Sequence, residues 1–140
     1  MKALITTNLM KFTLATLLLT LLFRFGLSTS ITKHLIIAVV FSAVIYAILM
    51  WFNGRYFGWK EYEYLPIYDI GFRFHLATFL SHNLISILWF VFGLQSHYED
   101  ISVIFITAGI WFVFLFIHLI YYLSIRKSTI KDLDKKDLFE

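Results

Sequence analysis

Four long apolar runs constrain the fold of this chain more than any other feature of its sequence. Each run exceeds 20 residues, and a helix needs roughly 20 apolar residues to cross about 30 Å of hydrocarbon. The runs are continuous rather than alternating, which disfavours barrel strands, and a helix satisfies its own backbone groups without water. The sequence therefore predicts an all-α integral membrane protein, a bundle of four transmembrane helices with spans at 8–28, 33–53, 71–94 and 101–125.

The composition argues against a soluble fold for a chain of this size. Of its 140 residues, 60% are hydrophobic and only 15% are charged, whereas soluble proteins carry about 25% charged residues. The excess apolar surface must face lipid. The sequence contains no Cys, which excludes disulfides, thiolate metal sites and cysteine nucleophiles. The basic residues behind the net charge of +3 sit at the ends of apolar runs, so we expect membrane lipid as a partner and no nucleic acid.

The distribution of Lys and Arg predicts the orientation in the membrane. If the N-terminus is cytoplasmic, only Arg24 and Lys33 of the twelve basic residues lie outside. Under the positive-inside rule, this bias predicts both ends inside, with a cytoplasmic tail at 126–140. Cleavage of the first span as a signal peptide is the alternative, which the lack of an Ala-x-Ala pattern at 24–27 disfavours. The abundance of Phe, Ile, Leu, Lys and Tyr favours a multi-pass protein of a bacterial inner (cytoplasmic) membrane.

The connection at 54–70 is predicted to be an interfacial aromatic loop. It contains six aromatic residues, including Trp59, interleaved with charged residues, a mixture favoured at the headgroup level. Pro66 should break any helix there. Asp69 and Arg73 are four residues apart and are expected to pair at the inner interface. An aromatic belt explains this segment, and a gating or partner-binding element is the alternative.

Polar residues repeat at helical spacing inside the apolar runs and form the candidate site. Residues three or four positions apart share one face of a helix, and such polar faces should turn towards protein or water rather than lipid. The first span contributes Thr13, Thr16 and Thr20, and the second contributes Ser42, Tyr46 and Asn53. In the third and fourth spans, the residues predicted to line a polar interior or pathway are His75, Thr78, His82, Asn83, Ser86, His118 and Tyr121.

Depth along the helices predicts a pair between His82 and His118. His82 follows Arg73 by nine residues and His118 precedes Arg126 by eight, so both imidazoles should lie roughly 12–14 Å from the inner boundary. Such a pair can fix helix packing, belong to a proton or ion path, or ligate a metal or haem iron. Two His do not complete a zinc site. We therefore expect no cofactor, and His82 and His118 are the candidates if a metal or haem is bound.

The function classes that remain follow from what the spans contain. All nine acidic residues fall in predicted loops, interfaces or the tail, which disfavours a transporter that binds cations through a buried carboxylate. Phosphate loops, Ser–His–Asp patterns and paired carboxylates are also missing from the sequence, so we do not expect an enzyme. The first hypothesis is an oligomeric channel, transporter or pore-forming component. The alternatives are a non-catalytic accessory or anchoring subunit of a larger membrane complex, and an intramembrane His-ligated protein.

Overall fold

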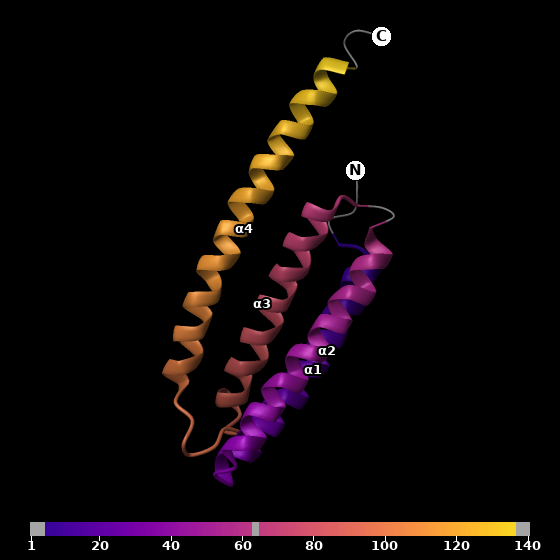
Figure 1. Cartoon of the computed structure of the whole chain (residues 1–140). Coiled ribbons are helices and arrows are strands. Elements are labelled where there is room, and N and C mark those ends of the chain that lie inside the picture. The colour runs from indigo at the N-terminus through magenta and orange to yellow at the C-terminus, as the bar shows by residue number, and fades with distance from the viewer. Residues whose placement is uncertain (1–4, 63–64, 137–140) are drawn as a thin grey trace.

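The computed structural model describes the backbone of residues 5–62 and 65–136, and the side chains as far as Ile125. Within these residues the chain forms four helices and no strand: α1 (Thr7–Thr32), α2 (Ile36–Glu61), α3 (Ile67–Val91) and α4 (Ile101–Lys136). All four helices contain a stretch long and apolar enough to cross a membrane. The all-helical prediction is confirmed, and the four candidate spans support a multi-pass membrane protein (Figure 1).

Local sequence explains where the helices begin and end. Thr6 caps α1, because its hydroxyl accepts a hydrogen bond from the Leu9 backbone N–H. Pro66 is extended and directly precedes α3, as expected for a residue that cannot donate a helical hydrogen bond. After α3 the chain turns at Gly93, whose φ of 68° lies in the left-handed region that glycine adopts at little cost.

The four helices are not packed equally. They run alternately up and down, and the described ends of α1 and α4 nearest the two termini lie towards the same end of the molecule (Figure 1). In the described part of the chain, α1 packs against both α2 and α3, whereas α4 packs against α3 alone. α1, α2 and α3 therefore form the body of the bundle, and α4 is a peripheral helix.

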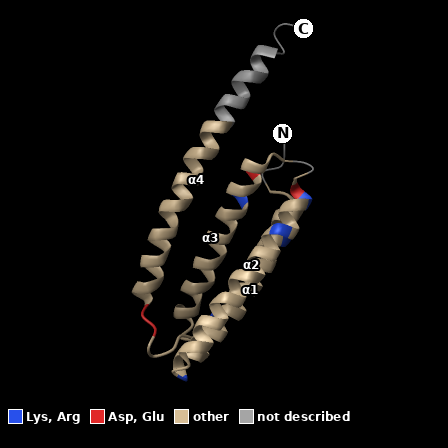
Figure 2. Cartoon of the chain, in the orientation of Figure 1, with Lys and Arg blue, Asp and Glu red and all other residues tan. Residues whose placement is uncertain are grey.

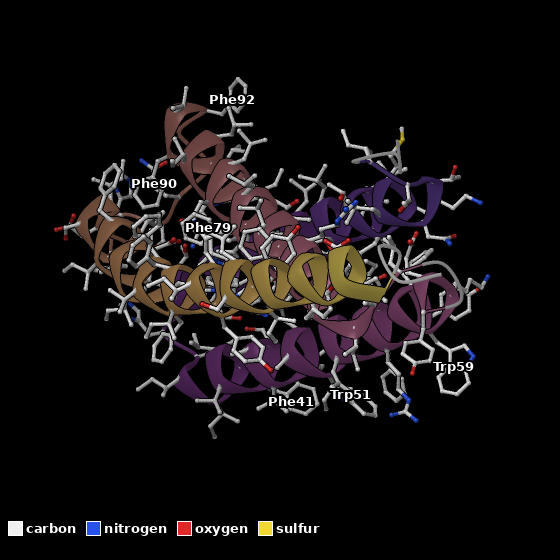
Figure 3. All side chains as sticks on the ribbon, turned by 90° about the horizontal axis from the view of Figure 1, so that it is seen from above. Phe41, Trp51, Trp59, Phe79, Phe90 and Phe92 are labelled. Carbon is white, nitrogen blue, oxygen red and sulfur yellow. The ribbon has the colours of Figure 1, made fainter. Side chains whose placement is uncertain are left out.

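The segment 54–70 differs from the interfacial loop that the sequence predicted. α2 continues to Glu61 and α3 already begins at Ile67, so only 62–66 connects them. The physical reason is that Pro66 is the first residue after the second apolar run that cannot be helical, and the aromatic residues before it are compatible with a helix. Trp59 lies on this last part of α2 and is exposed, as Figure 3 shows for Phe41 and Trp51 as well.

Charged residues gather at the two ends of the bundle and leave its middle almost free of charge (Figure 2). Asp69 and Arg73 lie at the end that carries the termini, and Glu99 and Asp100 lie in the connection between α3 and α4. This separation is the pattern of a chain whose middle lies in hydrocarbon. We call the end with residues 33–35 and 92–100 the loop end.

Candidate functional site: a polar interior

The buried face of α1 is polar rather than apolar. Phe12, Thr16, Thr20, Arg24 and Ser28 follow one another at intervals of four residues, and all five are buried. Thr16 and Thr20 are 0% exposed. Small polar residues let helices approach closely inside a membrane and form hydrogen bonds between them. We call these five residues the polar stripe of α1.

Each polar member of this stripe bonds to another part of the chain. The side-chain amide of Asn53 on α2 donates to the Thr16 hydroxyl over 3.1 Å. The indole N–H of Trp89 on α3 donates to the Ser28 hydroxyl over 2.9 Å. Through these contacts α1 holds α2 and α3 in place, so the stripe lies at the centre of the bundle.

A directed chain of hydrogen bonds leads from α3 to this stripe. The hydroxyl of Thr20 donates to the Thr16 carbonyl over 2.8 Å, so its oxygen must accept from the Tyr46 hydroxyl, 3.0 Å away. Tyr46 then accepts from Nδ1 of His82, at 3.1 Å. Because Nδ1 carries the proton, the lone pair of the neutral ring is on Nε2. Tyr46 and Thr20 thereby fix both the orientation and the tautomer of His82.

A second cluster joins α3 to α4. Nε1 of Trp111 donates to Nε2 of His75 over 2.6 Å. Because an indole can only donate, Nε2 of His75 carries the lone pair and its Nδ1 carries the proton. That Nδ1 lies 3.3 Å from Nδ1 of His118 and donates to it. Gly71 packs beside the His118 ring, and a Cβ at this position would be in ordinary van der Waals contact with its Cε1, at 3.5 Å.

The structure brings His118 to His75, and not to His82 as predicted. Trp111, seven residues before His118, occupies the level of His82, with the two ring centroids 5.5 Å apart. We expected the inner membrane boundary at Arg73 and Arg126, but both helices continue past these residues. Because His118 contacts His75 and not His82, α4 is shifted along α3 by about seven residues, or roughly 10 Å, from the expected position.

The structure places the other predicted residues in several different environments. Thr78 and Asn83 donate to backbone carbonyls of their own helix, and Ser86 is buried with its hydroxyl unpaired among the described residues. Tyr121 was predicted to face the interior, yet it is 58% exposed, because α4 packs against α3 alone in the part of the chain that the structure describes. The expected ion pair between Arg73 and Asp69 is present and has two hydrogen bonds, of 2.8 and 2.9 Å.

Two buried charged residues were not predicted from the sequence. Arg24 was expected to extend to the outer interface, but it is buried and forms an ion pair of 2.7 Å with Glu99. Glu61, expected in a loop, is 1% exposed at the end of α2 and accepts a hydrogen bond from Thr6. The four-residue spacing of Arg24 from Thr20 and Thr16 was the available signal for the first. The sequence contains no such signal for Glu61, because this residue was predicted to lie in a loop and not at the end of a helix.

The proton positions in the cluster of His75, His118 and Trp111 do not fit a metal ion bound there. The gap between Nδ1 of His75 and Nδ1 of His118 suits two ligands of one tetrahedral zinc ion, since Zn–N bonds of about 2.0–2.1 Å subtend roughly 3.3 Å. However, Trp111 fixes the proton on Nδ1 of His75, whereas a ligating imidazole carries its proton on the remote nitrogen. The described residues also contain no group of three or more potential metal ligands.

Comparisons of the chain with protein families, with characterised proteins and with solved structures found no match.

Proposed function

We propose that this protein is a channel or transporter component that moves protons or other small polar solutes through its histidine-containing interior. The observation that carries the proposal is the hydrogen-bonded chain His82–Tyr46–Thr20, in the middle of helices long enough to span a membrane. Polar and ionisable groups at membrane depth are costly and commonly mark a pathway for ions or protons. Here they also have defined proton positions, which helix packing alone does not require.

The polar groups follow one another along the bundle axis, which supports a route across the membrane. At the loop end lies the ion pair of Arg24 with Glu99, and near the termini lies the pair of Asp69 with Arg73. His82 and His75 stand between these two pairs, seven residues apart on α3, or roughly 10 Å. No gap along this series is longer than about two helical turns.

Trp111 separates the two histidines and gives the route a natural barrier. Its ring centroid is 5.5 Å from that of His82 and 6.1 Å from that of His75. An indole donates but does not accept hydrogen bonds, so it cannot relay a proton. If Nε2 of His75 takes up a proton it can no longer accept from Trp111, and the indole must turn away. Proton uptake at His75 would thus move the side chain that blocks the route.

Flux measurements in liposomes test this proposal. Purified protein in vesicles with an internal pH-sensitive dye should dissipate an imposed pH gradient, and His82→Ala should slow this at least tenfold. His34→Ala is the matched control, because His34 is an exposed histidine at the loop end, and it should conduct like the wild type. Equal flux in empty vesicles and protein vesicles would overturn proton movement. Equal flux in wild type and His82→Ala would remove His82 from the route.

We also propose that both termini are cytoplasmic, in a bacterial inner membrane. The bias of basic residues towards the end with the termini supports this orientation. Because the chain has no native Cys, a single Cys introduced at Lys33 reports the side of the loop end. It should react with a membrane-impermeant maleimide added outside intact cells. Protection there, with labelling only after lysis, would reverse the orientation.

Assembly with further copies, or with other membrane subunits, is favoured by the free surface of α4. The side chains of Ile106, Ile110, Val113 and Ile117 are all more than half exposed, and a groove of about 450 Å³ beside them reaches His75 and Trp111. If α4 instead docks on a larger complex, the chain is an accessory subunit. Sedimentation of the purified protein in detergent separates these roles, since a homo-oligomer keeps its size without partners.

A further inference from the structure

We infer that Arg24 and Ser86 hold internal water that joins His82 to a cavity at the loop end, and that the ion pair of Arg24 with Glu99 is the gate of this entrance. The inference deepens the proposed function and rests on it. The entrance of the route lies at this ion pair, and the species that enter it are water and hydronium.

The register of α1 against α3 places Arg24 and Ser86 at the same level. The rings of Phe12 and Phe74 are 4.4 Å apart, and Trp89 bonds to Ser28. These contacts join residues that differ by 62 and 61 positions, and both helices run in the same direction (Figure 1). The same offset puts Ser86 beside Arg24. The ring of Phe90, one turn further along α3, lies 5.7 Å from the Arg24 guanidinium carbon.

Two polar atoms remain unsatisfied at this level. Among the residues that the structure describes, neither Nε of Arg24 nor the hydroxyl of Ser86 has a hydrogen-bond partner, although both are buried. Buried polar groups are nearly always paired, and ordered water commonly supplies the missing partner. Nε can donate to such water, and the Ser86 hydroxyl can donate and accept. Both lie one helical turn from the His82–Tyr46–Thr20 chain, on the loop-end side.

A cavity at the loop end is lined by Glu99, the residue that pairs with Arg24. It has a volume of about 550 Å³, and its lining includes Phe90, His97, Glu99 and Asp100. One oxygen of Glu99 accepts from Arg24 over 2.7 Å and the other accepts from the Ser96 backbone N–H over 3.0 Å. The ion pair therefore stands between the cavity and Ser86. It neutralises Arg24, so the entrance does not repel a positively charged solute.

A proton can enter by steps that each conserve charge and atoms. Hydronium in the cavity gives a proton to the Glu99 carboxylate and becomes water. The neutral carboxyl releases Arg24 and passes a proton to the internal water, and that water gives a proton to Nε2 of His82, which carries the lone pair. Glu99 is then a carboxylate again and re-forms the pair with Arg24.

We call the space between His82 and the loop-end cavity, where Arg24 and Ser86 would hold water, the gap. The accessibility of an introduced thiol tests whether water fills this gap, without a measurement of flux. In a chain with no native Cys, Ser86→Cys should react with silver ions, which travel only through water, at least tenfold faster than Ser81→Cys. Ser81 is the matched control, a serine on the same helix that is 3% exposed against 1% for Ser86. Reaction is read as loss of maleimide labelling after denaturation. Equal rates at the two positions would overturn the gap.

The gate is tested by removing its charges in the Ser86→Cys background. Glu99→Gln should speed the silver reaction severalfold, and Lys33→Gln, at an exposed charged residue of the loop end outside the cavity lining, should leave the rate unchanged. If Glu99→Gln impairs folding, the double variant Arg24→Gln/Glu99→Gln avoids an unpaired buried charge and should give the same increase. An unchanged rate in folded protein would overturn the gate. Fast silver reaction with no proton flux in the wild type would refute the proposed function and leave the gap standing.

Discussion

α1 and α4 are both long apolar helices, yet they are attached to the molecule in opposite ways. α1 presents a buried polar stripe that bonds to α2, to α3 and to the α3–α4 connection. α4 packs against α3 alone, and its main polar link in the described part is the cluster of Trp111 with His75 and His118. α1 is the central helix of the bundle, and α4 is a peripheral helix attached to α3 along one side.

With two kinds of attachment, one chain can have helices that stay in place and a helix that responds to protonation. Apolar side chains gain little by leaving lipid for a helix interface, so packing and interhelical hydrogen bonds decide which helices stay together. The bonds of α1 are buried and have fixed donors, whereas those of α4 lie beside an open groove and include histidines that change protonation. We therefore expect α4 to be the helix that moves when the route opens.

The largest expected effect comes from breaking the buried ion pair. Arg24→Ala leaves the Glu99 carboxylate buried without its cation, which typically costs about 3–5 kcal/mol. The free energy of unfolding, measured by denaturation with SDS in mixed micelles, should fall by this order. Lys33→Ala is the control, because Lys33 is exposed on the same side of the bundle, and it should have almost no effect. Similar losses in both variants would mean that the pair does not hold the connection to α1.

The same substitution at two tryptophans compares the two regions directly. Trp89→Phe removes a buried donor to Ser28 and should cost about 1–2 kcal/mol, near the upper end for hydrogen bonds between membrane helices. Trp111→Phe removes a donor to half-buried His75 and should cost less than about 1 kcal/mol. Hydrogen exchange should rise in α1 and α3 for the first variant and in α4 alone for the second. Equal losses of unfolding free energy in the two variants would refute the distinction between the central helix α1 and the peripheral helix α4.

A smaller effect on stability is expected from Tyr46→Phe, which should nevertheless change conduction. The variant keeps the ring, which stacks on Phe23 at 4.4 Å, but it removes the hydroxyl that joins Thr20 to His82. Stability should fall by about 1 kcal/mol. Because His82 loses its fixed tautomer, proton flux should fall severalfold, whereas Tyr121→Phe on the exposed face of α4 should alter neither quantity. Flux unaffected by Tyr46→Phe would make this chain of bonds purely structural.

The sequence predicts the helices and the polar faces of α1 to α3, but not how the helices are offset. Thr16, Thr20, Tyr46 and His82 were all identified from spacing, since helical periodicity decides which residues share a face. The partner of His118 was predicted wrongly, because an offset between two helices depends on tilt and packing that periodicity does not contain. Arg24 was misplaced for a related reason. Its partner lies 75 residues away in a connection, and no local pattern joins the two.

The smallest expected effect concerns the first turn of α4, where the helix is attached to its connection. The Asp100 carboxylate accepts a hydrogen bond from the Ser102 backbone N–H over 2.8 Å, and this bond lowers the pKa of Asp100 from its ordinary 3.8. Because the pKa is lowered in the folded state, the stabilisation is complete above the ordinary pKa and is lost as the pH falls through the lowered one. Asp100→Ala should therefore reduce the unfolding temperature at neutral pH by less than about 3 °C.

This deficit of Asp100→Ala should shrink on acidification, because the wild type then loses the same bond. Asp100→Asn keeps a neutral acceptor, so its difference from the wild type should not vanish at low pH in the same way. Thermal unfolding of the three proteins from pH 7 to pH 3 measures both trends. If α4 is held mainly along its contact with α3, the cap affects only its first turn, and hydrogen exchange should rise there while the rest of α4 is unchanged. A rise along the whole of α4 would show instead that the helix depends on its connection, and that the attachment to α3 is weaker than its buried residues imply.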